Sequence, residues 1–568
     1  MNKIMSSKYW WLYLLVVLLG INYIASRMHF RIDLTQEGRY TLSKTTRNLV
    51  KELNDQAVIT VFLTGDMPSG FKKLANSTND FLHILKEYNS TDINFRFKDP
   101  EEEMPDAPGI IYADTLQALG ATPINLTVQV KSGQQNKLVF PVALIEYKNR
   151  VKLVNLYAGG RRIITPEEMN SAEAMMEYQF AKAIDEINSP AKPLVAYTTG
   201  NGEPVDGSVY DLTQNIQKDY QLFQINLRTE RNIPDTFKVL MIVKPSTGFT
   251  EEEKLKIDQY IMNGGKALFF IDELFAEQDS LQYQPQTIAY DRNLNLTDLL
   301  FKYGVRINPD LVMDLQCDFL RFAVGGDPGN PQFEFLQWNY YPLFESKGNH
   351  PINRNLGLVA GRFVNPLDTI KTPDIKKTIL LSSSANSRIL GTPVMISLNE
   401  NRTTPEDALF KQSDIPVAAL LEGKFTSLYR NRLSAAQTDS LKKEGIAFKE
   451  QNAGDGKIIV VGDGDMVLND FSQKYGPLPM GLNLATLQSQ YEYQFANRDF
   501  LLNCLEYLTN KPGIIEIRNK DIVLRLLDTT KVAEQKTAWQ IANIGGTILL
   551  VLLFGFIYQA LRKKKYQG

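Results

Sequence analysis

Two long apolar segments, one near each end of the 568-residue chain, constrain its fold more than any other feature. The first, residues 9–25, carries no charge and is at the short end for a helix that crosses a bilayer. The second, residues 539–561, is long enough to span and is followed by the basic run RKKK at 562–565. Two buried core helices do not explain this pattern, because a soluble core helix rarely ends in such a basic run. We therefore predict two transmembrane helices, at 9–26 and 538–561.

The residues that flank these segments predict their orientation. The basic run after the second segment marks a cytoplasmic end, and Lys3 and Lys8 before the first segment agree with it. Arg27 and Arg31, just after the first segment, weaken the evidence from that end. Two crossings place both ends of the chain on the same side of the membrane. We expect a cytoplasmic N-terminus at 1–8, a basic cytoplasmic tail at 562–568, and the remainder outside the cytoplasm as a protein of the inner membrane.

A cleaved secretory signal peptide is the alternative for the first segment. Its cleavage site would follow Ala25, where small residues are needed one and three positions before the cut. The second of these positions holds Tyr23, which favours an uncleaved anchor.

The composition excludes several classes of protein. The 62 basic and 64 acidic residues nearly balance, which is not typical of a nucleic-acid-binding protein. Three histidines and two cysteines leave little for a zinc site or a disulfide framework. Cys317 and Cys504 suit an oxidising compartment either as free thiols or as one bridge, and the sequence does not decide between them.

Residues 27–160 are predicted to form a first α/β domain outside the membrane. The predicted elements are a helix capped by Ser43, a strand at 57–65, a helix at 71–88, a strand at 93–100, and strands at 124–130 and 137–147 that pair as a hairpin. The strand–helix–strand order implies neighbouring parallel strands. A thioredoxin-like sheet fits this order, without the Cys-x-x-Cys motif of a redox enzyme.

Residues 161–515 are predicted to form a second α/β domain. Thr165 to Glu168 make a capping box with proline at the first helical position, and apolar strands then alternate with amphipathic helices. This alternation predicts a doubly wound, mostly parallel sheet. Residues 317–407 are rich in Asn, Gly and Pro and are predicted to be an irregular insertion. A strand is expected at 513–518, and residues 516–537 are expected to form a juxtamembrane stalk.

The sequence lacks the motifs of the common enzyme classes. There is no phosphate-binding G-x-x-x-x-G-K-[ST] loop and no G-x-S-x-G nucleophile elbow. Cys504 lies on an apolar helix stripe, and Cys317 has no histidine close in sequence to activate it. We therefore expect a protein that is not an enzyme, with no catalytic residue, no resident metal and no cofactor.

Polar residues follow three of the predicted strands in the second domain. They are Gly200, Asn201, Gly202 and Glu203 after the first, Asp272 and Glu273 after another, and Asp463 and Asp465 after a third. Ligands of open α/β sheets bind at the carboxyl ends of the strands, so these residues are candidates for a polar-ligand or cation pocket. Tight turns whose carboxylates cap the next helix are the simpler explanation, and the sequence favours that explanation.

Several segments, taken in order, resemble one family of membrane proteins. The chain is similar to the gliding-motility-associated ABC transporter auxiliary proteins, the GldG-type family, over nearly its whole length. The similarity rests on RIDLTQEGRYTLS, AVITVFLTGDMPSGFK, LVAYTTGNGEP, LTQNIQKDY, TEEEKLKIDQYIMNGGKALFFIDE, NHPINRNL, PVAALLEGKF, VVGDGDM and the terminal span with its basic tail.

The resemblance implies a periplasm-facing subunit that accompanies an ABC permease and a separate ATPase. It also implies that the second domain has an amidotransferase-like (flavodoxin-like) fold, although the cysteine–histidine pair of amidotransferases is not recognisable here. What is transported, and whether the complex contains several copies of this chain, is left open. The alternatives are an envelope scaffold for gliding or secretion machinery, and an anchored hydrolase or amidotransferase using Asp463, Asp465, Glu203 or Cys317.

A small-residue face on the second span offers a contact for a partner helix. Small residues let two transmembrane helices approach closely, and an asparagine can hydrogen-bond across the contact. The residues are Ala542, Asn543, Gly545, Gly546 and Thr547. An isolated anchor with incidental glycines is the alternative.

Overall fold

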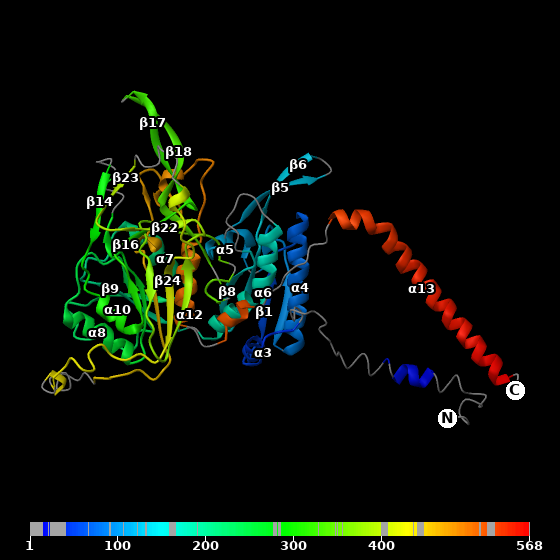
Figure 1. Ribbon diagram of the computed structural model, residues 1–568. Coiled ribbons are helices and arrows are strands. Elements are labelled where there is room, and N and C mark those ends of the chain that lie inside the picture. The colour runs from blue at the N-terminus through cyan, green and yellow to red at the C-terminus, as the bar shows by residue number, and fades with distance from the viewer. Residues whose placement is uncertain are drawn as a thin grey trace. The chain divides into compact units, whose positions relative to one another are not determined.

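A computed structural model of the chain divides into two compact units, Met1–Lys520 and Asp521–Gly568 (Figure 1). The structure describes residues 15–20, 22, 41–157, 166–276, 281, 286–398, 407–439, 448–519 and 529–566, apart from residues 66, 90, 91, 106, 122, 131, 132, 190, 328, 347, 349, 355, 435, 436 and 510–512. The described part is a mixed α/β protein with several sheets and one long C-terminal helix.

The first sheet has four strands in the order β2 (Ile93–Phe97), β1 (Ala57–Val61), β7 (Val142–Tyr147) and β8 (Arg150–Asn155). Strands β1 and β2 are parallel and are connected through α4 (Ser69–Tyr88), which confirms the predicted strand–helix–strand unit. Strand β7 is antiparallel to both of its neighbours. The preceding helix, α3 (Lys44–Lys51), begins as expected, because the Ser43 hydroxyl accepts a hydrogen bond from Thr46 N at 3.0 Å.

The predicted hairpin is present, but the predicted bounds of its second strand are wrong. Strands β5 (Ile124–Val130) and β6 (Gly133–Val139) pair as a separate two-stranded sheet, whereas β7 begins only at Val142. Pro141 lies between β6 and β7 and has no backbone N–H for a sheet ladder. The predicted strand at 137–147 is therefore divided between two sheets.

The large sheet has ten strands and is doubly wound in only one half. Its order is β10 (Gln221–Asn226), β9 (Leu194–Thr199), β11 (Val239–Val243), β12 (Lys266–Phe270), β25 (Gly456–Val461), β24 (Pro416–Gly423), β21 (Ile375–Ser382), β18 (Asn330–Ser346) and β17 (Cys317–Asp327), with β19 (Val359–Ala360) beside β18. Neighbours from β10 to β25 are parallel, and neighbours from β25 to β17 are antiparallel. The prediction of a mostly parallel sheet is correct for the first half and wrong for the second.

Helices cover both faces of the parallel half. Helices α7 (Tyr210–Asp219) and α12 (Asn497–Thr509) pack on one face, in the core cluster that contains Val239 and Met241. Helices α8 (Glu251–Met262) and α10 (Thr297–Tyr303) pack on the other, with Leu240 and Ile242. Side chains that alternate along a strand point to opposite faces, so a strand buried on both faces is almost entirely apolar. A capping box formed by Thr250 and Glu253 is present at the start of α8.

Much of the stretch 317–407 is regular, contrary to the expectation. It contributes β17, β18, β19 and β21 to the large sheet, together with the shorter strands β20 (Leu367–Thr369), β22 (Ser387–Gly391) and β23 (Val394–Ser397). Trp338, Tyr340 and Tyr341 on β18 are all buried, so this strand has no simple apolar–polar alternation. Gly325, Gly326, Pro331 and Pro342 further interrupt the pattern along β17 and β18, although both strands remain paired there.

The remaining elements are short. They are β3 (Glu103–Met104), β4 (Ala107–Ile111), α5 (Tyr112–Ala118), β13 (Leu274–Phe275), β14 (Gln286–Asp291), β15 (Val305–Ile307), β16 (Asp310–Asp314), β26 (Phe471–Ser472), β27 (Gly476–Pro477), and 3-10 turns at η1 (Gly207–Val209), η3 (Asp407–Leu409), η4 (Asp465–Val467), η5 (Leu484–Thr486) and η6 (Ile515–Asn519).

The strand expected at 513–518 is wrong, because η6 occupies most of it. Ile514 and Ile517 are buried in the same core cluster as residues of α6 (Pro166–Asn188). An apolar residue at every third position lies on one side of a 3-10 turn, and this spacing accounts for the packing. The predicted capping residue Thr165 lies outside the described residues, and α6 begins at the proline that was expected at the first helical position.

The C-terminal unit consists of helix α13 (Thr529–Tyr566). Within the described residues, its part Gln535–Lys564 is the one helix long and apolar enough to cross a membrane, and none of it is buried in the protein. Of the predicted first span, 9–26, residues 15–20 and 22 are helical and exposed, and the others lie outside the described residues. Residues 520–528 of the expected stalk also lie outside the described residues.

Candidate functional site

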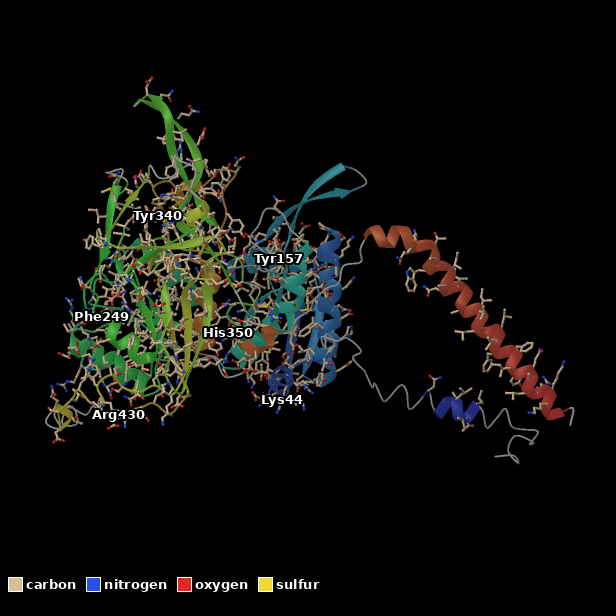
Figure 2. All side chains as sticks on the ribbon, viewed as in Figure 1. Lys44, Tyr157, Phe249, Tyr340, His350 and Arg430 are labelled. Atoms are coloured by element: carbon tan, nitrogen blue, oxygen red, sulfur yellow. The ribbon has the colours of Figure 1, made fainter. Side chains whose placement is uncertain are left out.

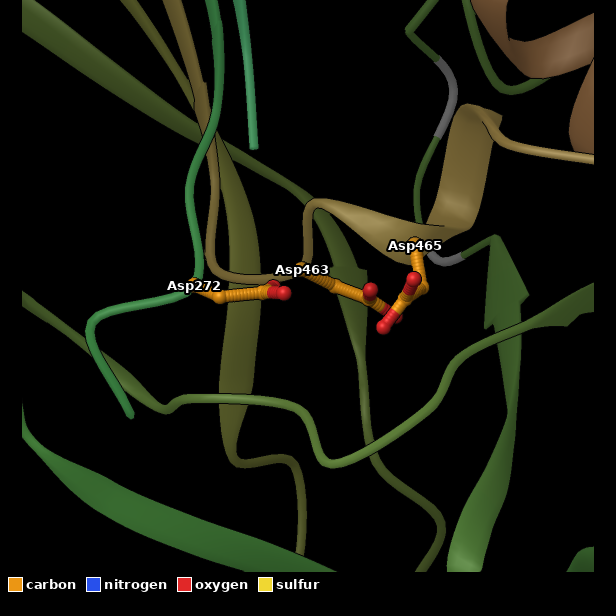
Figure 3. A group of neighbouring side chains, drawn as sticks. All are labelled: Asp272, Asp463 and Asp465. Atoms are coloured by element: carbon orange, nitrogen blue, oxygen red, sulfur yellow. The ribbon is translucent and has the colours of Figure 1, made fainter. Parts of the chain in front are cut away.

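Three of the predicted carboxylates meet at the carboxyl edge of the large sheet. Asp272 follows β12, and Asp463 and Asp465 follow the neighbouring strand β25. One oxygen of each side chain lies within 4.8 Å of one oxygen of the others. Figure 3 shows the Asp272 side chain extending toward Asp463, and the side chains of Asp463 and Asp465 extending toward one another. Asp463 is fully buried, Asp272 is buried and Asp465 is half-buried.

Lys244 supplies a positive charge to this acidic cluster of Asp272, Asp463 and Asp465. It follows β11, and its Nζ lies 2.6 Å from Asp465 Oδ1 and 3.5 Å from Asp272 Oδ2. Its backbone φ of 43° is in the left-handed region, which is unusual for a residue with a side chain. A Cβ added at Gly464 would lie 2.7 Å from Lys244 Cβ, so the two loops approach too closely for any other residue at 464.

Backbone N–H groups hold two of the carboxylates in place. Asp463 accepts hydrogen bonds from Met466 N at 3.0 Å and from Arg362 N at 2.9 Å, one on each oxygen. Asp272 accepts one from Gly464 N. These bonds fix the Asp272 and Asp463 side chains in place, and each of the two carboxylates retains further lone pairs.

Burial makes it costly for all three carboxylates to ionise at once. Burial raises the pKa of Asp272 to about 6, although the charge of Lys244 limits the increase. Burial and the charges of Asp272 and Asp465 raise the pKa of Asp463 well above its ordinary value. The acidic cluster thus holds protons at a pH where exposed aspartates have lost them.

Replacing Asp272 by asparagine is expected to change how stability depends on pH. The native pKa of about 6 exceeds the ordinary 3.8, so the folded state binds the proton more tightly. Binding of this proton therefore adds about 2–3 kcal/mol to the free energy of unfolding below about pH 4, and this contribution is lost as the pH rises through about 6. Thermal unfolding in EDTA from pH 4 to 7.5 should show this decline in the wild type and a flatter profile in Asp272→Asn. Equal slopes in the two proteins would contradict the assignment.

A pocket opens beside the acidic cluster. Asp465, Tyr341 and Arg362 line it together with Asp318, Ala360, Gly361, Leu468, Asp470, Gly481, Leu482, Asn483, Phe495 and Asn497. Arg362 binds Asp470 through two hydrogen bonds of 2.7 and 2.8 Å, and its guanidinium lies 5.3 Å from the centre of the Tyr341 ring. Burial alone would raise the pKa of Asp470, but the charge and hydrogen bonds of Arg362 lower it below its usual value.

The predicted loop 200–203 forms a separate group. Glu203 accepts hydrogen bonds from Thr198 Oγ1 and from Asn201 N, both at 2.8 Å, and Asn201 Nδ2 donates to Glu253 Oε2 at 3.2 Å. Gly200 has φ 113° and Gly202 has φ 78°. The Glu203 carboxylate therefore closes the turn on itself, whereas Asp206 caps the helical turn that follows. None of the hydrogen bonds described for Glu203 reaches the three aspartates.

The two cysteines are both free thiols and both buried. The Sγ of Cys317 donates to Asn339 Oδ1 at 3.4 Å, and burial strongly raises its pKa. Burial also raises the pKa of the Cys504 thiol, within the core that α12 helps to form. Neither environment is that of an activated nucleophile.

Sequence reasoning missed three residues of this site: Lys244, Tyr341 and Arg362. Lys244 directly follows the apolar strand β11, so the rule that found Asp272 and Asp463 would also have found it. Tyr341 and Arg362 lie in the stretch that was expected to be irregular, and no local pattern places them beside the sheet edge.

The predicted partner face of α13 is exposed throughout. Its residues are Ala542, Asn543, Gly545, Gly546 and Thr547. The Thr547 hydroxyl donates to the carbonyl of Asn543 at 2.6 Å, which satisfies it within the helix.

Comparisons with known proteins place the chain in a family. A model of an ABC-type uncharacterized transport system matches residues 192–504, more than half of the chain, and a domain of unknown function (DUF7088) matches residues 36–146. A protein of Borreliella burgdorferi, described as uncharacterized, is 21% identical over 554 residues, 94% of each chain.

Two solved structures show weaker similarity. The mmIFT52 N-terminal domain is 14% identical with a TM-score of 0.30, over 56% of this chain and 99% of that one. The exo-beta-1,4-mannosidase Op5Man5 from Opitutaceae bacterium strain TAV5 is 9% identical with a TM-score of 0.19, over 75% of this chain and 51% of that one. Both scores are too low to support an argument about fold or function. The match to residues 192–504 is extensive enough to assign membership: the chain belongs to the family of the ABC-type uncharacterized transport system.

Proposed function

We propose that this chain is a non-catalytic, membrane-anchored subunit of an ABC transporter complex of the GldG type, associated with gliding motility. The family match carries the proposal, and the exposed apolar helix α13 supports it. A chain with one or two spans and no phosphate-binding loop does not move a substrate by itself. It therefore works with a permease subunit and, through that permease, with a separate ATPase.

In this proposal, α13 and a first helix at 9–26 cross the inner membrane. The basic residues Arg562, Lys563 and Lys564 at the end of α13 favour a cytoplasmic C-terminus. Both termini are then cytoplasmic, and the α/β part faces the periplasm, where it binds a partner protein or a substrate.

The proposed architecture has two α/β domains outside the membrane. The order β2-β1-β7-β8, with β7 antiparallel to its neighbours, supports a thioredoxin-like first domain. Helices on both faces of β10-β9-β11-β12-β25 support an amidotransferase-like second domain. The buried thiols of Cys317 and Cys504 support a subunit that does not use amidotransferase chemistry.

Co-purification tests this function directly. Extraction of the full chain in mild detergent is expected to recover a permease and an ATPase with it, identified by mass spectrometry. Recovery of this chain alone from membranes that contain both partners would contradict the proposal. Normal gliding in a strain whose partner ATPase is inactive would favour the scaffold alternative.

The small-residue face of α13 gives a sharper prediction. Replacing Gly546 by leucine is expected to reduce recovery of the permease at least tenfold, because a bulky side chain separates two closely packed helices. Gly555 lies nine residues later, on the opposite side of the helix, so Gly555→Leu is the matched control for Gly546→Leu. Equal loss of permease in both variants, or in neither, would rule out this face as the contact.

A further inference from the structure

We propose that Asp272, Asp463 and Asp465 bind a hard divalent cation of the size of Ca²⁺, with the Tyr341 hydroxyl beside it. This binding site is additional to the proposed transporter role, and neither depends on the other. Carboxylate and hydroxyl oxygens are the ligands that Ca²⁺, Mg²⁺ and Mn²⁺ prefer, whereas softer metals prefer nitrogen and sulfur.

The spacing of the oxygens matches a calcium-sized ion. The three ligand oxygens all lie within 4.8 Å of one another. Calcium–oxygen distances are about 2.3–2.6 Å, so two oxygens on opposite sides of the ion lie up to about 5 Å apart. Magnesium binds at about 2.0–2.1 Å and needs a tighter arrangement of the loops after β12 and β25 than a calcium ion does. Those loops are held by the bonds to Gly464 N, Met466 N and Arg362 N.

The charge of the site is also matched to a divalent ion. Three ionised carboxylates and the ammonium of Lys244 leave an excess of two negative charges at a largely buried position. Buried charges of one sign are unstable unless they are paired or hold a metal ion. Without the cation, the available counterions are bound protons, Lys244, whose Nζ lies 2.6 Å from Asp465 Oδ1, and Arg292, whose charge also acts on Asp272. When the cation binds, it displaces this ammonium from Asp465.

An independent observation points to a ligand beside Asp465. The Tyr341 hydroxyl is buried and has no hydrogen-bond partner among the described residues, and the residue as a whole is only 2% exposed. Tyr341 and Asp465 line the same pocket. Asp465 and Lys244 are among the charged groups close enough to act on this hydroxyl, together with Arg362 and Asp470. A buried hydroxyl without a partner is costly, and a cation or its bound water would satisfy it.

The glycines around the acidic cluster fit a site that is closely packed around the carboxylates. A Cβ added at Gly361 would lie 2.9 Å from Asp463 Oδ2, and one at Gly464 would meet the side chain of Lys244. Gly361 also lines the pocket that reaches Asp465. The pocket therefore reaches Asp465, and the walls around the carboxylates have no room for larger side chains.

Calcium titration of the full-length protein tests the proposal. The chain is purified in detergent, stripped with EDTA and titrated with CaCl₂, with MgCl₂ and NaCl as comparisons, while thermal unfolding and heat of binding are measured. Wild type is expected to bind one Ca²⁺ saturably, and Ca²⁺ should raise the midpoint temperature of its thermal unfolding by several degrees. Binding of Mg²⁺ should be weaker. Asp465→Asn should abolish both effects. Asp298→Asn, which removes a carboxylate paired with Lys254 outside the cluster, should abolish neither.

Two further variants separate a cation site from a simple lysine ion pair. Lys244→Met removes the competing ammonium and is expected to be less stable in EDTA but to bind Ca²⁺ at least tenfold more tightly than wild type. Tyr341→Phe is expected to weaken Ca²⁺ binding several-fold, while the midpoint temperature of thermal unfolding in EDTA is unchanged or higher. If Ca²⁺ affects neither wild type nor Lys244→Met, or affects only Lys244→Met, the lysine is the permanent counterion and the proposal is wrong. Co-purification with the permease is scored separately, so failure of either proposal leaves the other standing.

Discussion

Replacing Asp258 by alanine is expected to destabilise the α/β unit by about 3–5 kcal/mol. Asp258 lies on α8 and is fully buried. Its carboxylate accepts hydrogen bonds from the Tyr303 hydroxyl at 2.8 Å, the Ser427 hydroxyl at 2.6 Å, Leu428 N at 2.9 Å and Gln259 Nε2 at 3.0 Å. Alanine would leave these buried donors without their acceptor and open a cavity between α8, α10 and the loop after β24.

The measurement is urea unfolding of the purified chain, followed by circular dichroism. Asp258→Asn keeps one accepting oxygen and is expected to lose about half as much stability. Glu450→Ala is a surface control, because Glu450 pairs with Arg430 at 2.9 Å and its side chain is 58% exposed. Such a pair contributes about 0.5 kcal/mol or less. Similar losses for Asp258→Ala and Glu450→Ala would show that this buried contact is not a main stabilising element.

Placing arginine at both Leu549 and Leu552 is expected to prevent α13 from crossing the membrane. Both residues are near the centre of the apolar part Gln535–Lys564, and both are exposed. Each arginine costs about 2.5–3.5 kcal/mol at the centre of a transmembrane helix, so two cost about 5–7 kcal/mol.

The expected result is a change in the location of the C-terminus. A C-terminal tag should be protected from protease in spheroplasts of the wild type and become accessible in Leu549→Arg/Leu552→Arg. Leu549→Ile/Leu552→Ile is the matched control, because leucine and isoleucine insert equally well. A tag that stays protected in the arginine variant would contradict a membrane-spanning α13. A tag that is already accessible in the wild type would overturn the proposed orientation.

Local sequence signals were sufficient for many elements of the fold. The Ser43 cap of α3 and the capping box of α8 are present, and the strand–helix–strand unit of the first sheet pairs as expected. These features depend on residues that are close in the sequence, such as Thr250 and Glu253. The physical causes, namely satisfied N–H groups at a helix start and an apolar strand, act over a few residues.

The predictions failed where strand pairing depends on distant partners. Strand β21 joins the large sheet beside β24, and the bond from Arg362 N to Asp463 crosses 101 residues. No periodicity within 317–407 indicates these partners. The strand expected at 513–518 failed for the same reason: its apolar residues pack with α6, and this packing favours a 3-10 turn rather than a sheet edge.

By itself, the sequence determined the apolar C-terminal helix, the alternation of strands and helices, and the carboxylates placed after β12 and β25. The tertiary structure decided which of them meet. Strands β12 and β25 are neighbours in the sheet, so Asp272 lies beside Gly464, 192 positions away, while Glu203 forms its own contacts with Thr198 and Asn201. The order of strands in a sheet follows from how the whole core packs, and no short segment of the chain contains that information.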